Sequence, residues 1–205
     1  MFEDVLSPLL SALRDLVAWS QKEHIRSVII GGVAASLLGR PRLTRDIDAV
    51  VLLDSKRWKK FLTVGQQFGF EPRIQDPLIF ARKNRILLVN HKPTGIDVDI
   101  SLGALPFEEE AIERAVSSEV AGVNIPLPTP EDLIIMKAVA GRPRDQVDIE
   151  SLLDAHPRLD LKRVRRWVRE FSVAMAMPEI YDRLNEHLVK RSRKVSRRKK
   201  PVKGR

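Results

Sequence analysis

The sequence predicts an α/β (α+β) fold in which helices flank a mixed β-sheet, followed by a small C-terminal helical region and a disordered basic tail. Up to about residue 128, aliphatic runs of strand length alternate with amphipathic stretches, a pattern typical of a sheet covered by helices. Beyond that point the apolar residues recur at helical spacing, and the chain ends in a basic run. We therefore expect a core over residues 1–128, a helical region over 129–189 and a disordered tail over 190–205.

The individual elements follow from periodicity and from helix-breaking residues. A leucine stripe predicts an amphipathic first helix, and Gly39-Arg40-Pro41 and Gly69 end the second and third helices. The expected core elements are helices over 2–21, 33–38 and 56–68, a helical turn from Pro77, strands over 26–30, 47–53, 70–74, 85–90 and 96–102, and a short edge strand over 124–128. The expected C-terminal helices are 130–141, a second one that carries Asp148, a third with the stripe Leu161, Val164, Val168 and Phe171, and a last one over 178–189.

Composition narrows the class of protein. The chain has 205 residues, 43% of them hydrophobic, which is enough for a real core, and it has no cysteine and only four histidines. Disulfides, thiolate nucleophiles and zinc-thiolate sites are therefore excluded. With neither a signal-like segment nor an apolar run of membrane-spanning length in the sequence, we expect a cytoplasmic protein without a membrane partner.

The net charge of +9 is concentrated at the C-terminus. Residues 190–205 contain ten Lys or Arg and no acid, so the rest of the chain has 36 − 10 = 26 basic against 27 acidic residues. Such a self-repelling tail is predicted to be disordered and suits a phosphate backbone, although a merely solubilising end is the alternative.

Two carboxylates begin the strand predicted over 47–53. Asp46 and Asp48 flank Ile47, and because side chains alternate along a strand, both carboxylates point to one face while Ile47 points to the other. Two like charges held this close need a counter-charge. Mg²⁺ binds one or two protein carboxylates and completes its shell with water and phosphate oxygens. The alternative is that the two carboxylates are solvated at the start of an ordinary strand, which would give the same sequence pattern.

The glycine pair Gly31-Gly32 lies where the preceding strand passes into a helix. Glycine lets the backbone approach a ligand closely, and the N–H groups at a helix start attract phosphate. A glycine pair alone is a common turn, but together with the two carboxylates it indicates nucleotide chemistry. In the loop between them, Arg42 and Thr44 are candidate contacts for the triphosphate.

The glycine pair followed by Arg42, Thr44, Arg45, Asp46, Ile47 and Asp48 resembles the nucleotidyltransferase superfamily of the polymerase-β type. The resemblance implies that Asp46 and Asp48 bind metal, with two Mg²⁺ ions expected and Mn²⁺ as an alternative, and that a third carboxylate follows on a later strand. The segment from Val98 to Gly103 matches that setting, so Asp99 is the expected third ligand and general base, with Asp97 as an additional candidate.

A second motif lies within residues 131–149, which read EDLIIMKAVAGRPRDQVDI. It resembles the AbiEii-type nucleotidyltransferase toxins and their small relatives, and the resemblance implies that Lys137, Asp145 and Asp148 lie near the nucleotide. From periodicity alone, Lys137 would be an ordinary lysine that extends its ammonium group to solvent. Asp148 would equally serve as a helix cap.

The predicted function is Mg²⁺-dependent transfer of a nucleoside monophosphate from a nucleoside triphosphate to an acceptor hydroxyl. We expect an RNA acceptor, such as the 3′ end of tRNA, and a toxin role with an antitoxin partner is a further hypothesis; a protein hydroxyl or an aminoglycoside is the alternative acceptor. Competing hypotheses are a non-catalytic RNA- or protein-binding module and a phosphotransferase that moves the γ-phosphoryl group. The RNA hypothesis rests on the basic tail and on a polar helix face opposite the stripe of the third C-terminal helix, formed by Lys162, Arg163, Arg165, Arg166 and Arg169.

Overall fold

The structure is a computed structural model that describes residues 2–198 of the chain, with side chains described from residue 7 to residue 192. The chain forms two compact units. Among the described residues, the first unit comprises those up to residue 37 and residues 41–129, and the second comprises residues 38–40 and those from residue 130 onward.

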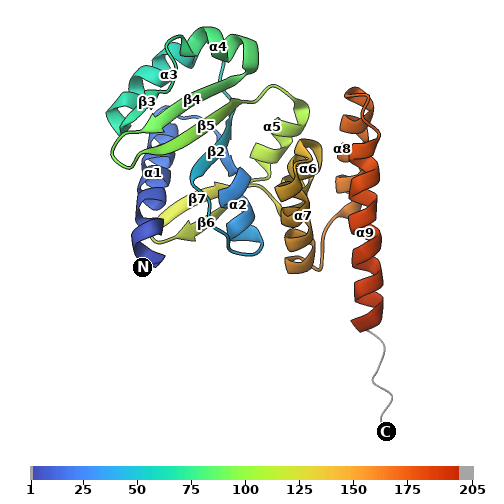
Figure 1. Ribbon diagram of the computed structural model, residues 1–205. Helices are drawn as coiled ribbons and strands as arrows, with labels where there is room; N and C mark the ends of the chain where they lie inside the picture. Colours follow the sequence, from blue (N-terminus) through green and yellow to red (C-terminus); the bar gives the residue numbers. More distant parts are fainter. Residues whose placement is uncertain (1, 199–205) are drawn as a thin grey trace. The chain divides into compact units, whose positions relative to one another are not determined.

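A five-stranded mixed sheet forms the centre of the first unit (Figure 1). Its strand order is β1-β2-β5-β4-β3; β2 and β5 are parallel, and the other neighbours are antiparallel. The prediction of a mixed sheet flanked by helices is confirmed. The strands are β1 (Ser27–Ile30), β2 (Asp46–Val51), β3 (Phe70–Pro72), β4 (Ile86–His91) and β5 (Ile96–Leu102).

Alternation along β2 and β5 divides their side chains between two faces. Ile47 and Val98 are fully buried on one face, while Asp46 and Asp48 point to the other, as strand parity requires. Farther along the acidic face, Val50 of β2 packs with Val28 of β1 and an isoleucine from a helix. The same face therefore has an apolar end, which packs the strands together, and an acidic end whose carboxylates do not take part in that packing.

Helices of the first unit cover the sheet and join its strands. The first helix buries its leucine stripe and ends near Trp19, which stacks on Phe61 at 4.0 Å and on Phe70 at 5.1 Å between ring centroids. The second helix begins at Gly31, two residues earlier than predicted, so the glycine pair belongs to its first turn. The helices are α1 (Phe2–Lys22), α2 (Gly31–Leu38), α3 (Trp58–Gly65) with 3₁₀ turns at Ser55–Arg57 and Gln66–Phe68, α4 (Pro77–Asn84) and α5 (Pro106–Glu113).

A second, two-stranded antiparallel sheet pairs β6 (Val116–Val120) with β7 (Val123–Leu127). The strand predicted over 124–128 corresponds to β7, whereas β6 was not predicted. Because β6 is largely exposed on both faces, its sequence lacks the alternation by which a half-buried strand is recognised.

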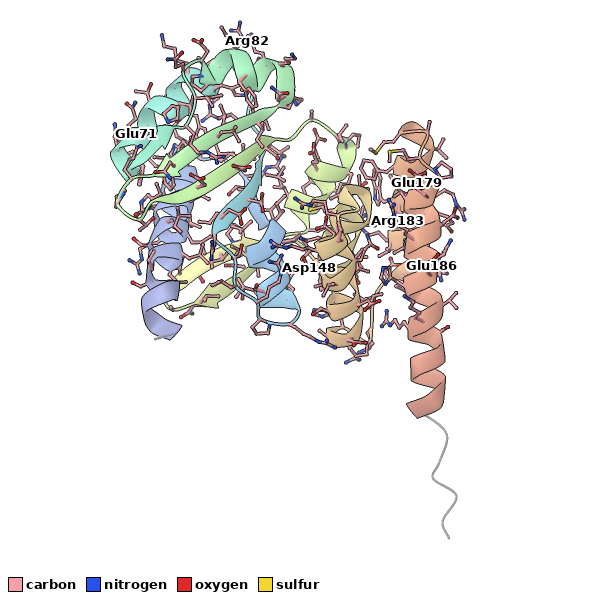
Figure 2. The ribbon with its side chains drawn as sticks, in the orientation of Figure 1. Glu71, Arg82, Asp148, Glu179, Arg183 and Glu186 are labelled. Atoms are coloured by element: carbon pink, nitrogen blue, oxygen red, sulfur yellow. The ribbon has the colours of Figure 1, made fainter. Side chains whose placement is uncertain are left out.

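The second unit is helical. Its elements are α6 (Pro130–Ala140), α7 (Pro143–Ala155), α8 (Leu161–Ala174) and α9 (Glu179–Arg198). Buried Ile180, Leu184 and Leu188 recur every four residues along α9, and Figure 2 shows Glu179, Arg183 and Glu186 along the same helix. None of the described helices is both long and apolar enough to cross a membrane.

The end of α9 differs from the predicted tail. The helix continues to Arg198, so residues 190–198 are helical, where a disordered tail was predicted from residue 190. Lysine and arginine are good helix formers, and the packed first half of α9 supplies the nucleus from which the helix continues. Residues 199–205 of the predicted tail lie outside the described residues.

Candidate active site

The backbone at Gly31 lies directly against the side chain of Asp48. Gly31 follows β1 and has a φ angle of +64°, a left-handed conformation that glycine adopts without strain. A Cβ atom on Gly31 would lie 1.8 Å from Oδ2 of Asp48. Glycine is therefore required both by the backbone turn and by the carboxylate beside it.

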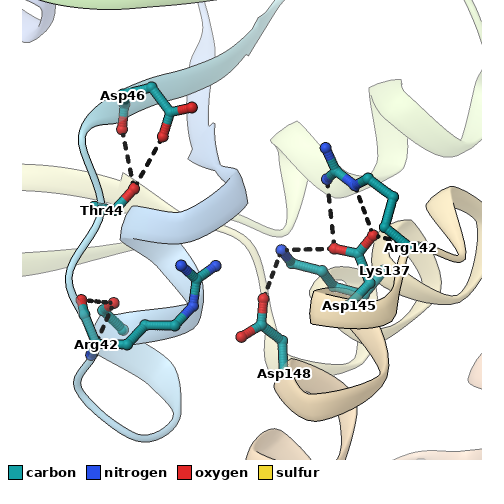
Figure 3. A network of polar contacts seen from close by, with 8 residues as sticks. Arg42, Thr44, Asp46, Lys137, Arg142, Asp145 and Asp148 are labelled. Atoms are coloured by element: carbon teal, nitrogen blue, oxygen red, sulfur yellow. Dashed lines mark hydrogen bonds and ion pairs between the residues drawn. The ribbon is translucent and has the colours of Figure 1, made fainter.

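Gly32 meets the loop that precedes β2. A Cβ atom there would lie 2.5 Å from Oγ1 of Thr44 and 3.3 Å from the guanidinium group of Arg42. Thr44 donates a hydrogen bond of 3.0 Å to Oδ1 of Asp46 (Figure 3). Ser36 donates one of 2.9 Å to the backbone carbonyl of Arg42. The structure thus brings together the glycine pair, the loop and the first carboxylate of β2.

Four carboxylates lie on one face of the two parallel strands. Asp46 is opposite Asp97 and Asp48 is opposite Asp99 in the register of β2 and β5, and partners in register point to the same face. The predicted third carboxylate, Asp99, is therefore the direct neighbour of Asp48, and Asp97 is the direct neighbour of Asp46.

Arg73, directly after β3, neutralises two of these carboxylates. One guanidinium nitrogen lies 3.0 Å from Oδ2 of Asp97, and another forms a short hydrogen bond with Oδ1 of Asp99. Asn90 on β4 donates a 2.8 Å hydrogen bond to Oδ1 of Asp97. Both oxygens of Asp97 are thus engaged, one by Asn90 of the adjacent strand β4 and the other by Arg73, which follows β3.

The pKa of Asp99 is raised above the ordinary aspartate value. Burial is the largest cause, and the nearby charges of Asp46 and Asp97 add to it, while the guanidinium of Arg73 lowers the pKa and offsets part of the increase. The carboxylate is therefore a better proton acceptor than an exposed aspartate.

The metal ligands predicted at Asp46, Asp48 and Asp99, with Asp97 as an addition, stay a prediction. Over the part of the chain whose side chains are described, no three acidic or histidine side chains converge into a group that could hold an ion. Arg73 is one physical reason why these carboxylates do not converge, because the Asp99 carboxylate is paired with its guanidinium group.

Sequence reasoning missed Arg73 and Asn90. A signal was present, since two carboxylates on one face of the strand 96–102 require a neutralising partner, but this pattern does not show which residue supplies the positive charge. Arg73 is 26 residues away from Asp99 in the chain, so no local motif connects them.

In the second unit, Lys137 of α6 forms a buried cluster with two carboxylates of α7. Its ammonium nitrogen lies 3.0 Å from Oδ1 of Asp145 and 2.8 Å from Oδ2 of Asp148, and the lysine side chain is 5% exposed (Figure 3). Periodicity alone indicated that Lys137 extends to solvent, and the structure shows instead that it is buried. Lys137, Asp145 and Asp148 of the motif contact one another.

Asp145 also caps the first turn of its own helix, α7. Its carboxylate accepts hydrogen bonds from the backbone and the side chain of Arg142, at 3.0 Å and 2.8 Å. Burial is the largest single influence and raises the pKa of Asp145, but the hydrogen bonds and the positive charges of Arg142 and Lys137 together lower it by more, so the net pKa lies below the ordinary value. The aspartate is therefore ionised, which suits an ion pair that fixes α6 to α7.

The predicted basic face of α8 needs one correction. Arg163 is not a surface residue of that face, because its side chain is 9% exposed and pairs with fully buried Asp132 of α6 at 2.8 Å. The helical pattern of α8 could not show this, because the buried acid comes from another helix. The residues of the predicted face that remain exposed are Lys162, Arg165, Arg166 and Arg169.

A glycine turn from strand to helix, an Asp-x-Asp strand beside it and a parallel strand with a further carboxylate together define a nucleotidyltransferase-type domain. The family described as "Nucleotidyltransferase of unknown function (DUF6036)" matches residues 7–199. The chain belongs to this family. None of the curated proteins compared with the sequence matches it.

Solved structures share the fold. The antibiotic-resistance factor ANT(2″)-Ia, solved in solution, is 16% identical with a TM-score of 0.59, over 84% of this chain and 96% of that one. The crystal structure of ANT(2″)-Ia with adenylyl-2″-tobramycin is 18% identical with a TM-score of 0.52, over 79% and 95%. An antigenic nucleotidyltransferase-like protein from Paracoccidioides brasiliensis is 16% identical with a TM-score of 0.52, over 86% and 92%. The AbiEii-type relationship stays a prediction.

Proposed function

We propose that the protein transfers a nucleoside monophosphate from a nucleoside triphosphate to an acceptor hydroxyl and releases pyrophosphate. The observation that carries this proposal is the contact between the Gly31 backbone and Asp48. One turn then offers both the phosphate-binding N–H groups of a helix start and a carboxylate of the Asp-x-Asp strand. Membership of a nucleotidyltransferase family supports the reaction class.

The donor set suits Mg²⁺, with two ions proposed and Mn²⁺ as a substitute. Carboxylates are hard oxygen ligands, and those of Asp46, Asp48 and Asp99 lie on one sheet face and would hold the metal. Asp97 is less suited, because both of its oxygens already have partners. When bound, such ions stabilise charge on the attacking and leaving oxygens of an in-line displacement.

The glycine pair and its loop would hold the triphosphate. Gly31 and Gly32 have no side chains to cover their backbone N–H groups. The planar guanidinium of Arg42, a group that suits phosphate, lies beside Gly32. Thr44 would act indirectly, since its hydroxyl orients Asp46.

Asp99 would take the proton from the attacking hydroxyl at one of its carboxylate oxygens. A general base works best when its pKa is raised toward the working pH, and burial raises the pKa of Asp99 despite the nearby Arg73. Asp48 is the direct neighbour of Asp99 on the parallel strand.

A nucleotide contact by Lys137, Asp145 and Asp148 remains a proposal that rests on the motif. An ammonium group has three donors, and Asp145 and Asp148 accept from it at 3.0 Å and 2.8 Å. The ion pairs therefore favour a structural role for the cluster, in which Lys137 fixes α6 to α7.

RNA is the acceptor that the exposed basic residues of α8 favour. Arg166 lies over the ring of Trp167 at 5.2 Å, and Arg169 lies over the ring of Tyr181 at 4.8 Å. Guanidinium groups and aromatic rings together can bind phosphates and stack with unpaired bases. Similarity of fold to ANT(2″)-Ia makes an aminoglycoside such as tobramycin the alternative acceptor.

Incubation with α-labelled or γ-labelled triphosphates tests the reaction, with total RNA and tobramycin offered separately. Label from the α position in a product supports nucleotidyl transfer and identifies the acceptor. Label from the γ position would show a phosphotransferase, and absence of both would favour a non-catalytic binding module. A toxin role, an antitoxin partner and a cytoplasmic location stay predictions.

Replacement of Asp48 by Asn should abolish transfer, because the variant removes the carboxylate that lies against Gly31. Asp54→Asn is the matched control, because Asp54 caps the 3₁₀ turn after β2 by accepting from Lys56 N at 2.8 Å, and asparagine caps as well as aspartate. Undiminished transfer by Asp48→Asn would remove this residue from the mechanism.

A further inference from the structure

Asp97 and Asn90 hold Arg73 in a defined position. Asp97 accepts from Asn90 through Oδ1 and pairs with Arg73 through Oδ2, at 2.8 Å and 3.0 Å. Asn90 also donates a 3.0 Å hydrogen bond to the Gly95 carbonyl, which anchors it to the turn between β4 and β5. A carboxylate with both oxygens engaged serves to orient its partners rather than to bind a ligand.

Arg73 in turn holds Asp99, the proposed base and metal ligand. The guanidinium group spans the two carboxylates with separate nitrogens, and the Arg73 side chain is 26% exposed. Contact with both Asp97 and Asp99 neutralises a pair of like charges that share one face of β5. The arginine thus supplies the counter-charge at the position where the proposed function places a cation.

We infer that Arg73 is a positioning residue that competes with a divalent cation for Asp99, so that this arginine sets how readily the site accepts metal. This inference rests on the proposed function. Arg73 holds the Asp99 carboxylate through a hydrogen bond, and metal binding by that carboxylate requires the arginine to give up this bond. Asp97 keeps the released guanidinium nearby, because its own contact with Arg73 involves a different nitrogen.

Mn²⁺ binding by the full chain without nucleotide tests the inference, measured as the loss of the free-ion signal in electron paramagnetic resonance. Arg73→Gln should bind Mn²⁺ about fivefold more tightly than the parent protein, the upper range for loss of a partly exposed ion pair. Arg73→Lys should lie between the two, because lysine keeps the charge but cannot span both carboxylates.

Arg45→Gln is the matched control for charge. Arg45 is exposed and directly precedes Asp46, so this variant removes one positive charge near the carboxylates without touching the Arg73 contacts. If Arg73→Gln and Arg45→Gln tighten Mn²⁺ binding equally, net charge explains the effect and the inference is wrong. It is also wrong if Arg73→Gln binds no tighter than the parent.

Thermal unfolding provides a second readout and checks that the variants fold. Added Mn²⁺ should raise the melting temperature of Arg73→Gln by more than it raises that of the parent, because ligand stabilisation grows with affinity. If neither the parent nor any variant binds Mn²⁺, the metal site of the proposed function fails as well. Binding by the parent with no gain in Arg73→Gln overturns the inference alone.

Discussion

Gly31→Ala tests whether the contact between the glycine turn and Asp48 is required for the reaction. Alanine would have to adopt a φ angle of +64°, which costs about 1–2 kcal/mol for a residue with a Cβ atom. The new atom would also lie 1.8 Å from Oδ2 of Asp48, and because Cβ contacts under 3.0 Å essentially never occur, the carboxylate must move by about 3.0 − 1.8 = 1.2 Å. A misplacement of about 1 Å at a reacting centre can lower a rate about 100-fold.

Gly95→Ala separates the backbone penalty from the displacement of the carboxylate. Gly95 has a φ angle of +71°, but a Cβ atom there meets nothing within 4 Å. Urea unfolding should therefore show a loss of about 1–2 kcal/mol in Gly95→Ala, and at least that much in Gly31→Ala. The rate of α-label transfer should fall only in Gly31→Ala. Equal rates in the two variants, with both proteins folded, would refute the argument that Gly31 positions Asp48.

Other predictions concern the buried ion pairs and the raised pKa of Asp99. Lys137→Met should lower the free energy of unfolding by about 3–5 kcal/mol, because it leaves two carboxylates of a buried cluster without their shared cation; a loss under about 1 kcal/mol in urea unfolding would contradict that role. Arg163→Met should be similarly destabilising because it leaves Asp132, which is fully buried, without this partner, whereas Lys162→Met on the exposed side should change stability by less than about 0.5 kcal/mol. Asp99→Asn should abolish transfer and yet raise the melting temperature at pH 7. The pKa of Asp99 is higher in the folded protein, so stability is lost as the pH rises through that value. The gain should vanish at a pH well below the ordinary aspartate pKa, and a gain that persists there would show that charge is not its cause.

Local patterns were sufficient for much of the first unit. Alternation predicted that Ile47 would be buried and that Asp46 and Asp48 would share the other face, since the direction of a strand side chain depends only on its parity. The helical spacing of leucines predicted α1 for the same kind of reason. Neither conclusion needs any information about which segments become neighbours.

Local patterns failed where a polar side chain finds its partner far along the chain. Arg163 has the spacing of a surface residue on α8, but Asp132 from α6 buries it. Lys137 has the spacing of a solvated lysine on α6, but it pairs with two aspartates of α7. In both cases, the pattern of one helix carries no information about the charge of the helix packed against it.

The sequence by itself determined the mixed α/β fold, the glycine turn and the common face of the paired aspartates, because each depends on backbone preferences over a few residues. Only the tertiary structure decided that Asp48 lies beside Asp99 and against Gly31, and that Arg73 neutralises Asp97 and Asp99. Strand order and register set those distances, and electrostatic pairing depends on distance rather than on separation along the chain.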